Sequence, residues 1–389
     1  MNNKKKIIGY ILLLLSFIFL IRMVYTTIYS SITEFIDSRE YNLKDYIITE
    51  ELKPAFNKNN ISVAFASDNN YVKYLSVAIV SLTDNMSKDY NYDIVILEDN
   101  IKDKNKRLLL KQIKDFKNIS LRFIDINKHF DENKDVDFYL NKHFTKSIYS
   151  RLFIPNIFKN YEKVIYLDVD ILIKCNLIEL YNTGLGDNLI GGVAHIEFDP
   201  IFNPKGKNEG KNLENRLSKL YNIKDYSILS YINSGVILYN VANCSSQDFI
   251  KKCLNFIKSH KDATEPDQDT INGVCYRKIQ YLDYGYNLLP FYVDKIEAKI
   301  VHFYCYNYKP WNINSDNELN DNEQYAYWIK TSLKSPFFSN KKTKLKELRI
   351  NLMVNKIISK MYRSEELIKI YKTKIKNIEN RIEFIESIE

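Results

Sequence analysis

The chain has 389 residues, of which 45% are hydrophobic, and it contains only 10 Gly and 8 Pro. This length allows one large domain or two ordinary ones, and the composition excludes a fibrous or mostly disordered protein. The net charge of +8 indicates an anionic partner. No nucleic-acid-binding motif accompanies the basic residues, so we expect no nucleic acid partner. Five cysteines without a C-x-x-C pair indicate reduced thiols.

The N-terminus predicts a membrane anchor or interfacial segment over residues 1–26. An uncharged apolar run over residues 7–21 follows three lysines, and the bulky residues after Arg22 offer no cleavage site. A buried helix would rarely be apolar on every side. Continuing to residue 24, with Arg22 reaching back to the interface, brings the segment close to the ~20 residues that a span needs. We therefore expect a membrane surface as a partner.

Residues 27–60 are expected to form a linker or collar. Beyond them, strands at 61–66, 92–97, 119–124 and 163–167 alternate with helices at 71–82, 103–116 and 147–158. This alternation predicts an α/β fold with a Rossmann-like, largely parallel sheet flanked by helices. Ligands of such sheets bind at the carboxyl ends of the strands. Further strands are expected at 189–194 and 236–239, with an irregular polar loop over residues 200–225 between them.

Residues 313–389 predict C-terminal helices that form a basic amphipathic extension. Eight Lys or Arg and one Glu fall between residues 341 and 363, among apolar residues at helical spacing. Such a helix either lies in an anionic membrane interface or packs on the body with its charged face in water. Four later isoleucines recur every three or four residues, an apolar seam suited to a homo-oligomer: Ile375, Ile378, Ile382 and Ile385.

Asp168 and Asp170 follow the strand at 163–167 and form a D-x-D pair. Side chains two residues apart in extended chain point to the same side, so both carboxylates can converge on one cation. A hard divalent cation prefers such oxygen ligands and neutralises a diphosphate. A lone pair of this kind is more often an exposed turn, so the later motifs decide its meaning.

Several later polar residues fit the same site. His302 ends an apolar run, and an imidazole with two carboxylates suits manganese. Lys309, before Pro310-Trp311, can neutralise a phosphate. Asn233 precedes a glycine at the start of a strand, where a sugar can approach closely. The alternative for several acidic residues is local: Asp267 and Asp269 suit the first turn of a helix, and Asp68 or Asn70 suits an N-cap.

Six ordered blocks between residues 61 and 312 resemble the family 8 glycosyltransferases, in particular bacterial lipopolysaccharide galactosyl- and glucosyltransferases. The blocks are F-A-S-D-N-N-Y (65–71), Y-S-R-L (149–152), Y-L-D-V-D (166–170), N-S-G-V (233–236), D-Q-D (267–269) and H-F with K-P-W (302–311). The resemblance implies a retaining, manganese-dependent enzyme with the GT-A fold over residues 61–312. It implies a hexosyltransferase that moves galactose or glucose from a UDP-sugar donor to a glycan or glycolipid acceptor.

The resemblance also implies a role for each matching residue. Asp168, Asp170 and His302 would bind Mn²⁺ or Mg²⁺, with Asp168 also contacting the donor. The uracil and ribose would contact Ala66, Asp68, Asn70 and Tyr71. Lys309 would contact the diphosphate, and Arg151 would contact the donor's phosphate or sugar. Asn233 and the catalytic Asp267 would hold sugar hydroxyls, and the catalytic Gln268 would lie beneath the anomeric carbon. The chain departs from the family at Cys305, where glycine is usual, and at His195, where the family often has Asp.

Two other classes of protein remain open at this stage. Another metal-dependent phosphate enzyme, a nucleotidyltransferase or phosphohydrolase, would keep the carboxylates but would not need the Asn233 and Gln268 blocks. A membrane-tethered glycan-binding protein with a decayed site would explain the altered segment at Cys305. Because bacterial UDP-sugars are cytoplasmic, we expect the enzyme on the cytoplasmic face of a bacterial inner membrane. A eukaryotic enzyme with the same anchor would lie in the Golgi lumen.

Overall fold

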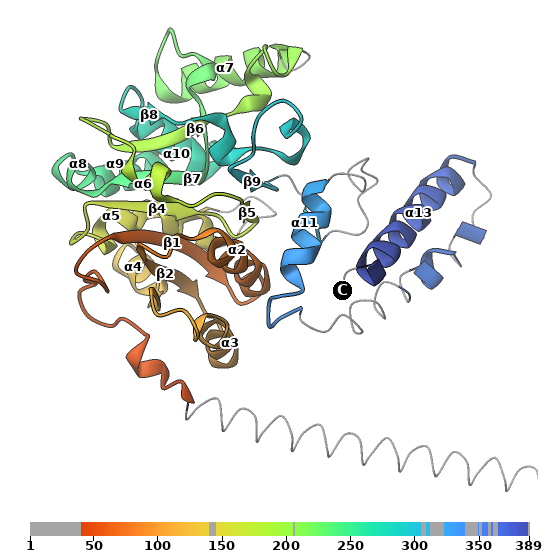
Figure 1. The fold of residues 1–389 in the computed structure, drawn as a ribbon. Helices are drawn as coiled ribbons and strands as arrows, with labels where there is room; N and C mark the ends of the chain where they lie inside the picture. Colours follow the sequence, from red (N-terminus) through yellow and green to blue (C-terminus); the bar gives the residue numbers. More distant parts are fainter. Residues whose placement is uncertain are drawn as a thin grey trace, which may run out of the picture.

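A computed structural model describes residues 40–139, 145–204, 207–304, 309–311, 323–338, 349, 352–356, 359–360 and 365–387. Its centre is a seven-stranded sheet in the order β3-β2-β1-β4-β7-β6-β8 (Figure 1). The strands are β1 (Asn60–Asp68), β2 (Asn91–Asp99), β3 (Ile119–Asp125), β4 (Lys163–Leu167), β6 (Ile190–Ala194), β7 (Ile232–Asn240) and β8 (Ile279–Tyr281). Strand β7 runs antiparallel to β4 and β6, and the other pairs are parallel. The predicted, mostly parallel α/β sheet is therefore confirmed.

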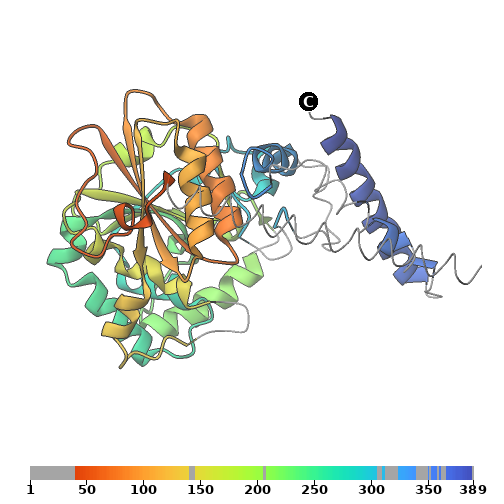
Figure 2. The ribbon, with the colours of Figure 1, turned by 90° about the horizontal axis from the view of Figure 1, so that it is seen from below.

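Helices cover both faces of this sheet, as its continuous apolar strands require. On one face lie α2 (Val72–Asn85) and α3 (Asp103–Ile113), whose apolar side chains pack on β1 and β2 (Figure 2). The other face is covered by α5 (Ile154–Ile157), α8 (Val241–Ser246), α9 (Phe249–Ser259) and α10 (Pro266–Val274). Short helices α4 (Asn127–Glu132) and α6 (Ile178–Asn182) complete the connections.

Two predicted elements differ from the structure. The segment expected as one helix over 147–158 is a 3₁₀ helix, η2 (Lys146–Phe153), followed by the single turn of α5. Pro155 at the start of α5 has no N–H to donate, so it suits the first turn of a new helix. The expected irregular loop over 200–225 contains a four-turn helix, α7 (Lys207–Tyr221), at the opposite end of the molecule from α3 in Figure 1.

A second, two-stranded sheet brings His302, in the last of the six sequence blocks, next to the end of β4. It pairs β5 (Ile171–Ile173) antiparallel with β9 (Ile300–His302), with Ile171 opposite His302. The backbone N–H of Phe303 also donates to the carbonyl of Asp170 at 2.9 Å. This pairing places His302 beside the D-x-D pair, although 132 residues separate His302 from Asp170.

The C-terminal part is helical where the structure describes it. Helix α11 (Glu323–Ser332) packs on α2, and α13 (Glu365–Ser387) lies beyond it (Figure 1). The seam residues Ile378, Ile382 and Ile385 are buried in a cluster with Trp328 of α11. The seam is therefore covered by the chain itself. Most of the basic segment 341–363 lies outside the described residues.

The structure contradicts the predicted membrane location. Within the described part of the chain, no helix is both long enough and apolar enough to cross a membrane. The segment on which the prediction rested, residues 1–26, lies outside the described residues. From the expected collar, residues 41–52 pack beside the sheet, where Ile47 bridges Phe123 of β3.

Candidate active site

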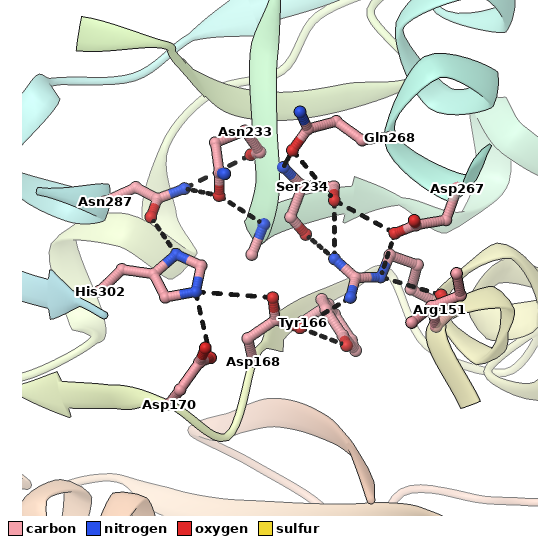
Figure 3. A network of polar contacts seen from close by, with 12 residues as sticks. Arg151, Tyr166, Asp168, Asp170, Asn233, Ser234, Asp267, Gln268, Asn287 and His302 are labelled. Carbon is pink, nitrogen blue, oxygen red and sulfur yellow. Dashed lines mark hydrogen bonds and ion pairs between the residues drawn. The ribbon is translucent and has the colours of Figure 1, made fainter. Parts of the chain in front are cut away.

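Three potential metal ligands converge where β4 ends. Strand β4 delivers Asp168 and Asp170, and β9 delivers His302; one ligand atom from each lies within 4.8 Å of the other two. His302 Nε2 is 3.1 Å from Asp170 Oδ1 and 3.6 Å from Asp168 Oδ2 (Figure 3). His302 is 1% exposed and Asp170 is 8% exposed. Two carboxylates and an imidazole in a mostly buried position form the oxygen-rich donor set that suits Mn²⁺ or Mg²⁺.

Asn287 determines which nitrogen of His302 faces the carboxylates. The Asn287 Nδ2 group donates to Asn233 Oδ1 at 2.9 Å, so Asn287 Oδ1 is the atom that faces His302 Nδ1 at 2.8 Å. This arrangement makes Nδ1–H the donor to Asn287 and leaves Nε2 as the nitrogen that faces the two carboxylates. One imidazole nitrogen and two carboxylate groups that face one another can bind one cation together. The site therefore fits a divalent metal ion.

Gly235 leaves space for the side chains of His302 and Asp168. A Cβ at this position would lie 2.1 Å from His302 Cε1 and 2.9 Å from Asp168 Oδ2. The Gly235 N–H donates to Asn233 Oδ1 at 3.0 Å, and its carbonyl accepts the N–H of Asp168 at 2.8 Å. The backbone of β7 thus runs directly against the ligands. Only a residue without a side chain fits there.

Lys309 lies at the same cluster and contacts the Asp170 carboxylate. Burial by itself would raise the pKa of Asp170, but Lys309 and His302 outweigh burial and hold that pKa well below its usual range. Asp170 is therefore ionised at neutral pH, as a metal ligand must be. Lys309 is described, whereas the preceding residues 305–308, including Cys305, lie outside the described residues.

Arg151 links the D-x-D pair to the D-Q-D block. Its guanidinium donates to Asp168 Oδ1 at 2.9 Å and to the Ser234 carbonyl at 2.6 Å, and its Nε is 3.1 Å from Asp267 Oδ2 (Figure 3). Burial alone would lower the pKa of Arg151, but the Asp168 and Asp267 carboxylates raise it overall. Tyr166 adds a 2.7 Å hydrogen bond to Asp168 Oδ1. Arg151 therefore stays charged and fixes the orientation of both carboxylates.

Gln268 is buried and held at both ends of its amide. The Ser234 N–H donates to Oε1 at 2.9 Å, and Nε2 donates to the Tyr231 hydroxyl at 3.1 Å. Asp267, next to it, is 5% exposed. Burial raises the pKa of Asp267 and Arg151 opposes this rise. Both residues lie in the first turn of α10, so the start of this helix provides the site with side chains.

The residues expected to hold uracil and ribose lie outside this network. Ala66 and Asp68 end β1, whose neighbour β4 carries the D-x-D pair. Asp68 Oδ1 accepts the backbone N–H groups of Asn70 and Tyr71 at 2.8 and 2.9 Å. These bonds close the turn before α2, whose N-cap position is Tyr71, so Asp68 stabilises that turn and does not cap the helix. Asn70 and Tyr71 are exposed beside it, and the Tyr71 ring lies edge-on to Trp311.

Sequence reasoning missed four residues that hold the site together: Tyr166, Tyr231, Ser234 and Asn287. Tyr166 and Ser234 lie inside two of the six sequence blocks, so the sequence alone could have identified them as site residues. Tyr231 precedes its block by two residues, and Asn287 sits in a 3₁₀ turn between β8 and β9 without any local pattern. Only the tertiary structure brings Asn287 to His302.

His195 occupies the end of β6, where its main-chain N–H donates to the Tyr231 carbonyl at 2.8 Å. Its Nδ1 is buried without a hydrogen-bond partner in the described structure, 3.5 Å from Glu197 Oε2. Burial lowers the pKa of His195 to about 4, and the neighbouring His302 adds to this effect. His195 is therefore neutral at pH 7.

Comparison with known proteins identifies the family. The model of glycosyl transferase family 8 matches residues 62–315. The chain belongs to this family. It is 26% identical over 264 residues to a putative glycosyltransferase of Haemophilus influenzae, which covers 65% of this chain and 73% of that protein. It is 25% identical over 185 residues to the lipopolysaccharide 1,3-galactosyltransferase of Salmonella typhimurium, 44% of this chain and 51% of that one.

A solved structure shows the same fold as this family 8 chain. The galactosyltransferase LgtC in complex with donor and acceptor sugar analogs superposes with a TM-score of 0.57 at 20% identity, over 71% of this chain and 96% of that one. This likeness confirms the GT-A type α/β fold. The family assignment confirms the prediction of an enzyme, a hexosyltransferase of the family 8 type. The alternative of a nucleotidyltransferase or phosphohydrolase is thereby set aside.

Proposed function

We propose that this family 8 enzyme transfers a hexose, galactose or glucose, from a UDP-sugar to a glycan or glycolipid acceptor with retention of configuration, and that it needs Mn²⁺ or Mg²⁺. The observation that carries the proposal is the cluster of Asp168, Asp170 and His302 with Lys309 beside it. A divalent cation held there would supply positive charge next to the diphosphate. The lipopolysaccharide galactosyltransferase relative and the likeness to LgtC support a hexose donor and a sugar acceptor.

We assign the residues of the site separate roles in binding the donor. Lys309 binds the donor diphosphate and stabilises the negative charge that grows on UDP as it leaves. Asn233 and Asp267 hold hydroxyls of the donor sugar, and Arg151 keeps the Asp267 and Asp168 carboxylates in place. Ala66, Asp68, Asn70 and Tyr71 bind uracil and ribose at the end of β1. Under this proposal the carboxyl ends of β1 and β4 together form the donor site.

Gln268 sets the stereochemistry. A neutral amide is a poor nucleophile, and both ends of this amide are already engaged with Ser234 and Tyr231. We therefore assign it to stabilising the oxocarbenium-like sugar from beneath. The acceptor hydroxyl then attacks from the face that UDP leaves, and a phosphate oxygen takes its proton. A product with inverted configuration would refute this mechanism.

The test is UDP release by the full chain from a panel of UDP-sugars, with mixed glycan acceptors, in the presence of Mn²⁺, Mg²⁺ or a chelator. We expect release from one hexose donor, loss on chelation and loss in Asp170→Ala. Asp115→Ala, which removes an exposed carboxylate at the end of α3, is the matched control and should keep full activity. Absence of release from every donor would instead favour a glycan-binding protein with a decayed site.

A further inference from the structure

Helix α7 presents an unusual polar face away from the core. Asn212, Asn215, Arg216 and Lys219 recur at intervals of three and four residues, which places them on one face of the helix. On another face, Leu217 and Leu220 are buried in a small apolar cluster. The polar face is therefore held rigidly at the surface by the packing beneath it.

This face lines one side of a cavity of about 610 Å³. The other side comes from the residues that follow α9, so the lining includes Asn212, Asn215, Arg216, Lys219, His260 and Asp262. Sites for small organic ligands commonly occupy about 300–1,000 Å³. The cavity is thus large enough for more than one sugar ring.

The lining indicates the chemistry of a ligand. Two side-chain amides and the Asp262 carboxylate can exchange hydrogen bonds with several hydroxyl groups. Lys219 and Arg216 add cationic N–H donors that can bind an acidic group, although the buried Asp269 carboxylate pairs with Arg216 from the inner side. The His260 ring is stacked on Phe256 at 4.1 Å between centroids, so it stands in a fixed orientation at the rim. Hydroxyl-binding groups combined with the cationic donors of Lys219 and Arg216 suit an acidic saccharide.

A buried chain of contacts joins this cavity to the proposed active site. Arg216 Nη1 is 3.1 Å from Asp269 Oδ2, and Asp269 Oδ1 accepts the Tyr231 hydroxyl at 2.6 Å. Tyr231 in turn accepts Gln268 Nε2 at 3.1 Å. Asp269 is 0% exposed and Tyr231 is 2% exposed, so these side chains separate the cavity from the donor site. Arg216 is the member of the chain that a ligand in the cavity can reach.

We propose that this cavity, between α7 and the residues after α9, is a second binding site for an acidic saccharide, distinct from the donor site. The acidic group binds Lys219 and Arg216, and the hydroxyls bind Asn212, Asn215 and Asp262. A ligand that draws Arg216 away from Asp269 changes the hydrogen bonding that orients Tyr231 and Gln268. Binding of a ligand in this cavity therefore affects hexose transfer at the active site. This coupling rests on the proposed function, whereas the binding itself does not.

Binding is tested by calorimetry on the full chain without metal or UDP-sugar. The probes are a uronate-containing disaccharide, the matched neutral disaccharide and inorganic phosphate. We expect saturable binding of the uronate alone, weakened about tenfold or more in Lys219→Ala, the loss of one charge-assisted contact. Lys211→Ala, an exposed lysine of α7 outside the cavity lining, should bind as the wild type does.

Several outcomes would overturn the proposal. Absence of saturable binding, or an equal loss of affinity in Lys219→Ala and Lys211→Ala, would refute the second site. Equal binding of the neutral disaccharide or of phosphate would refute an acidic saccharide as its ligand. For the coupling, saturating uronate should change the rate of UDP release at least twofold in the wild type and leave Arg216→Gln unaffected. An unchanged wild-type rate would refute the coupling alone. Absence of any UDP release would refute both the proposed function and the coupling, but it would not affect the conclusion on ligand binding in the cavity.

Discussion

Replacing Gly235 by alanine should disable the metal site while leaving the fold in place. The new Cβ would lie 2.1 Å from Cε1 and 2.6 Å from Nδ1 of His302. To reach an ordinary contact of 3.4 Å, the imidazole must retreat by about 1.3 Å. His302 is buried and tied to Asn287, so it cannot swing aside without losing its orienting hydrogen bond. The Asp168 carboxylate, 2.9 Å from the same Cβ, must move as well.

The expected loss follows from this displacement. A shift of about 1 Å in a reacting group costs on the order of a hundredfold in rate, so we expect UDP release to fall by about that factor. Mn²⁺ affinity, measured by calorimetry, should fall in parallel, and overpacking should cost about 1–3 kcal/mol of the free energy of unfolding. Gly184→Ala is the matched control, because a Cβ there meets no atom within 4 Å. Wild-type Mn²⁺ affinity and turnover in Gly235→Ala would refute the proposed metal site.

Three further predictions use the same network. Asn287→Leu removes the acceptor for the His302 Nδ1–H, so Mn²⁺ affinity in a calorimetric titration should fall roughly ten- to hundredfold; an unchanged value would contradict the assigned tautomer. Arg151→Lys cannot satisfy two buried carboxylates and a carbonyl together, so urea unfolding at pH 7 should show a loss of about 3–5 kcal/mol, and a loss below 1 kcal/mol would refute its linking role. His195 has a pKa of about 4 when folded against an ordinary 6.5, so the unfolded chain binds more protons between these values. Without added metal, the wild type should lose up to about 3 kcal/mol more than His195→Gln as pH falls from 6.5 to 4; parallel curves would refute its burial as a neutral ring.

Local pattern was enough for much of the fold. Apolar runs of β-forming residues at 61–66, 92–97 and 119–124 fall within β1, β2 and β3, because strands buried on both faces need such runs. The mostly polar residues of α7 predict a loop, whereas the structure forms a helix there. Its leucines at 213, 217 and 220 carried the helical spacing that could have identified it. A loop prediction gives no indication of the polar helix face that lines the second cavity.

The sequence by itself determined the family and the identity of the candidate ligands, because Asp168 and Asp170 depend only on the two-residue repeat of an extended chain. It could not determine how His302 is oriented, which residue leaves room for it, or what holds Gln268. Those properties depend on hydrogen bonds between residues that are far apart in the chain, such as Asn287 with Asn233 and Arg151 with Ser234. Only chain folding makes such contacts, since no local spacing encodes a partner more than fifty residues away.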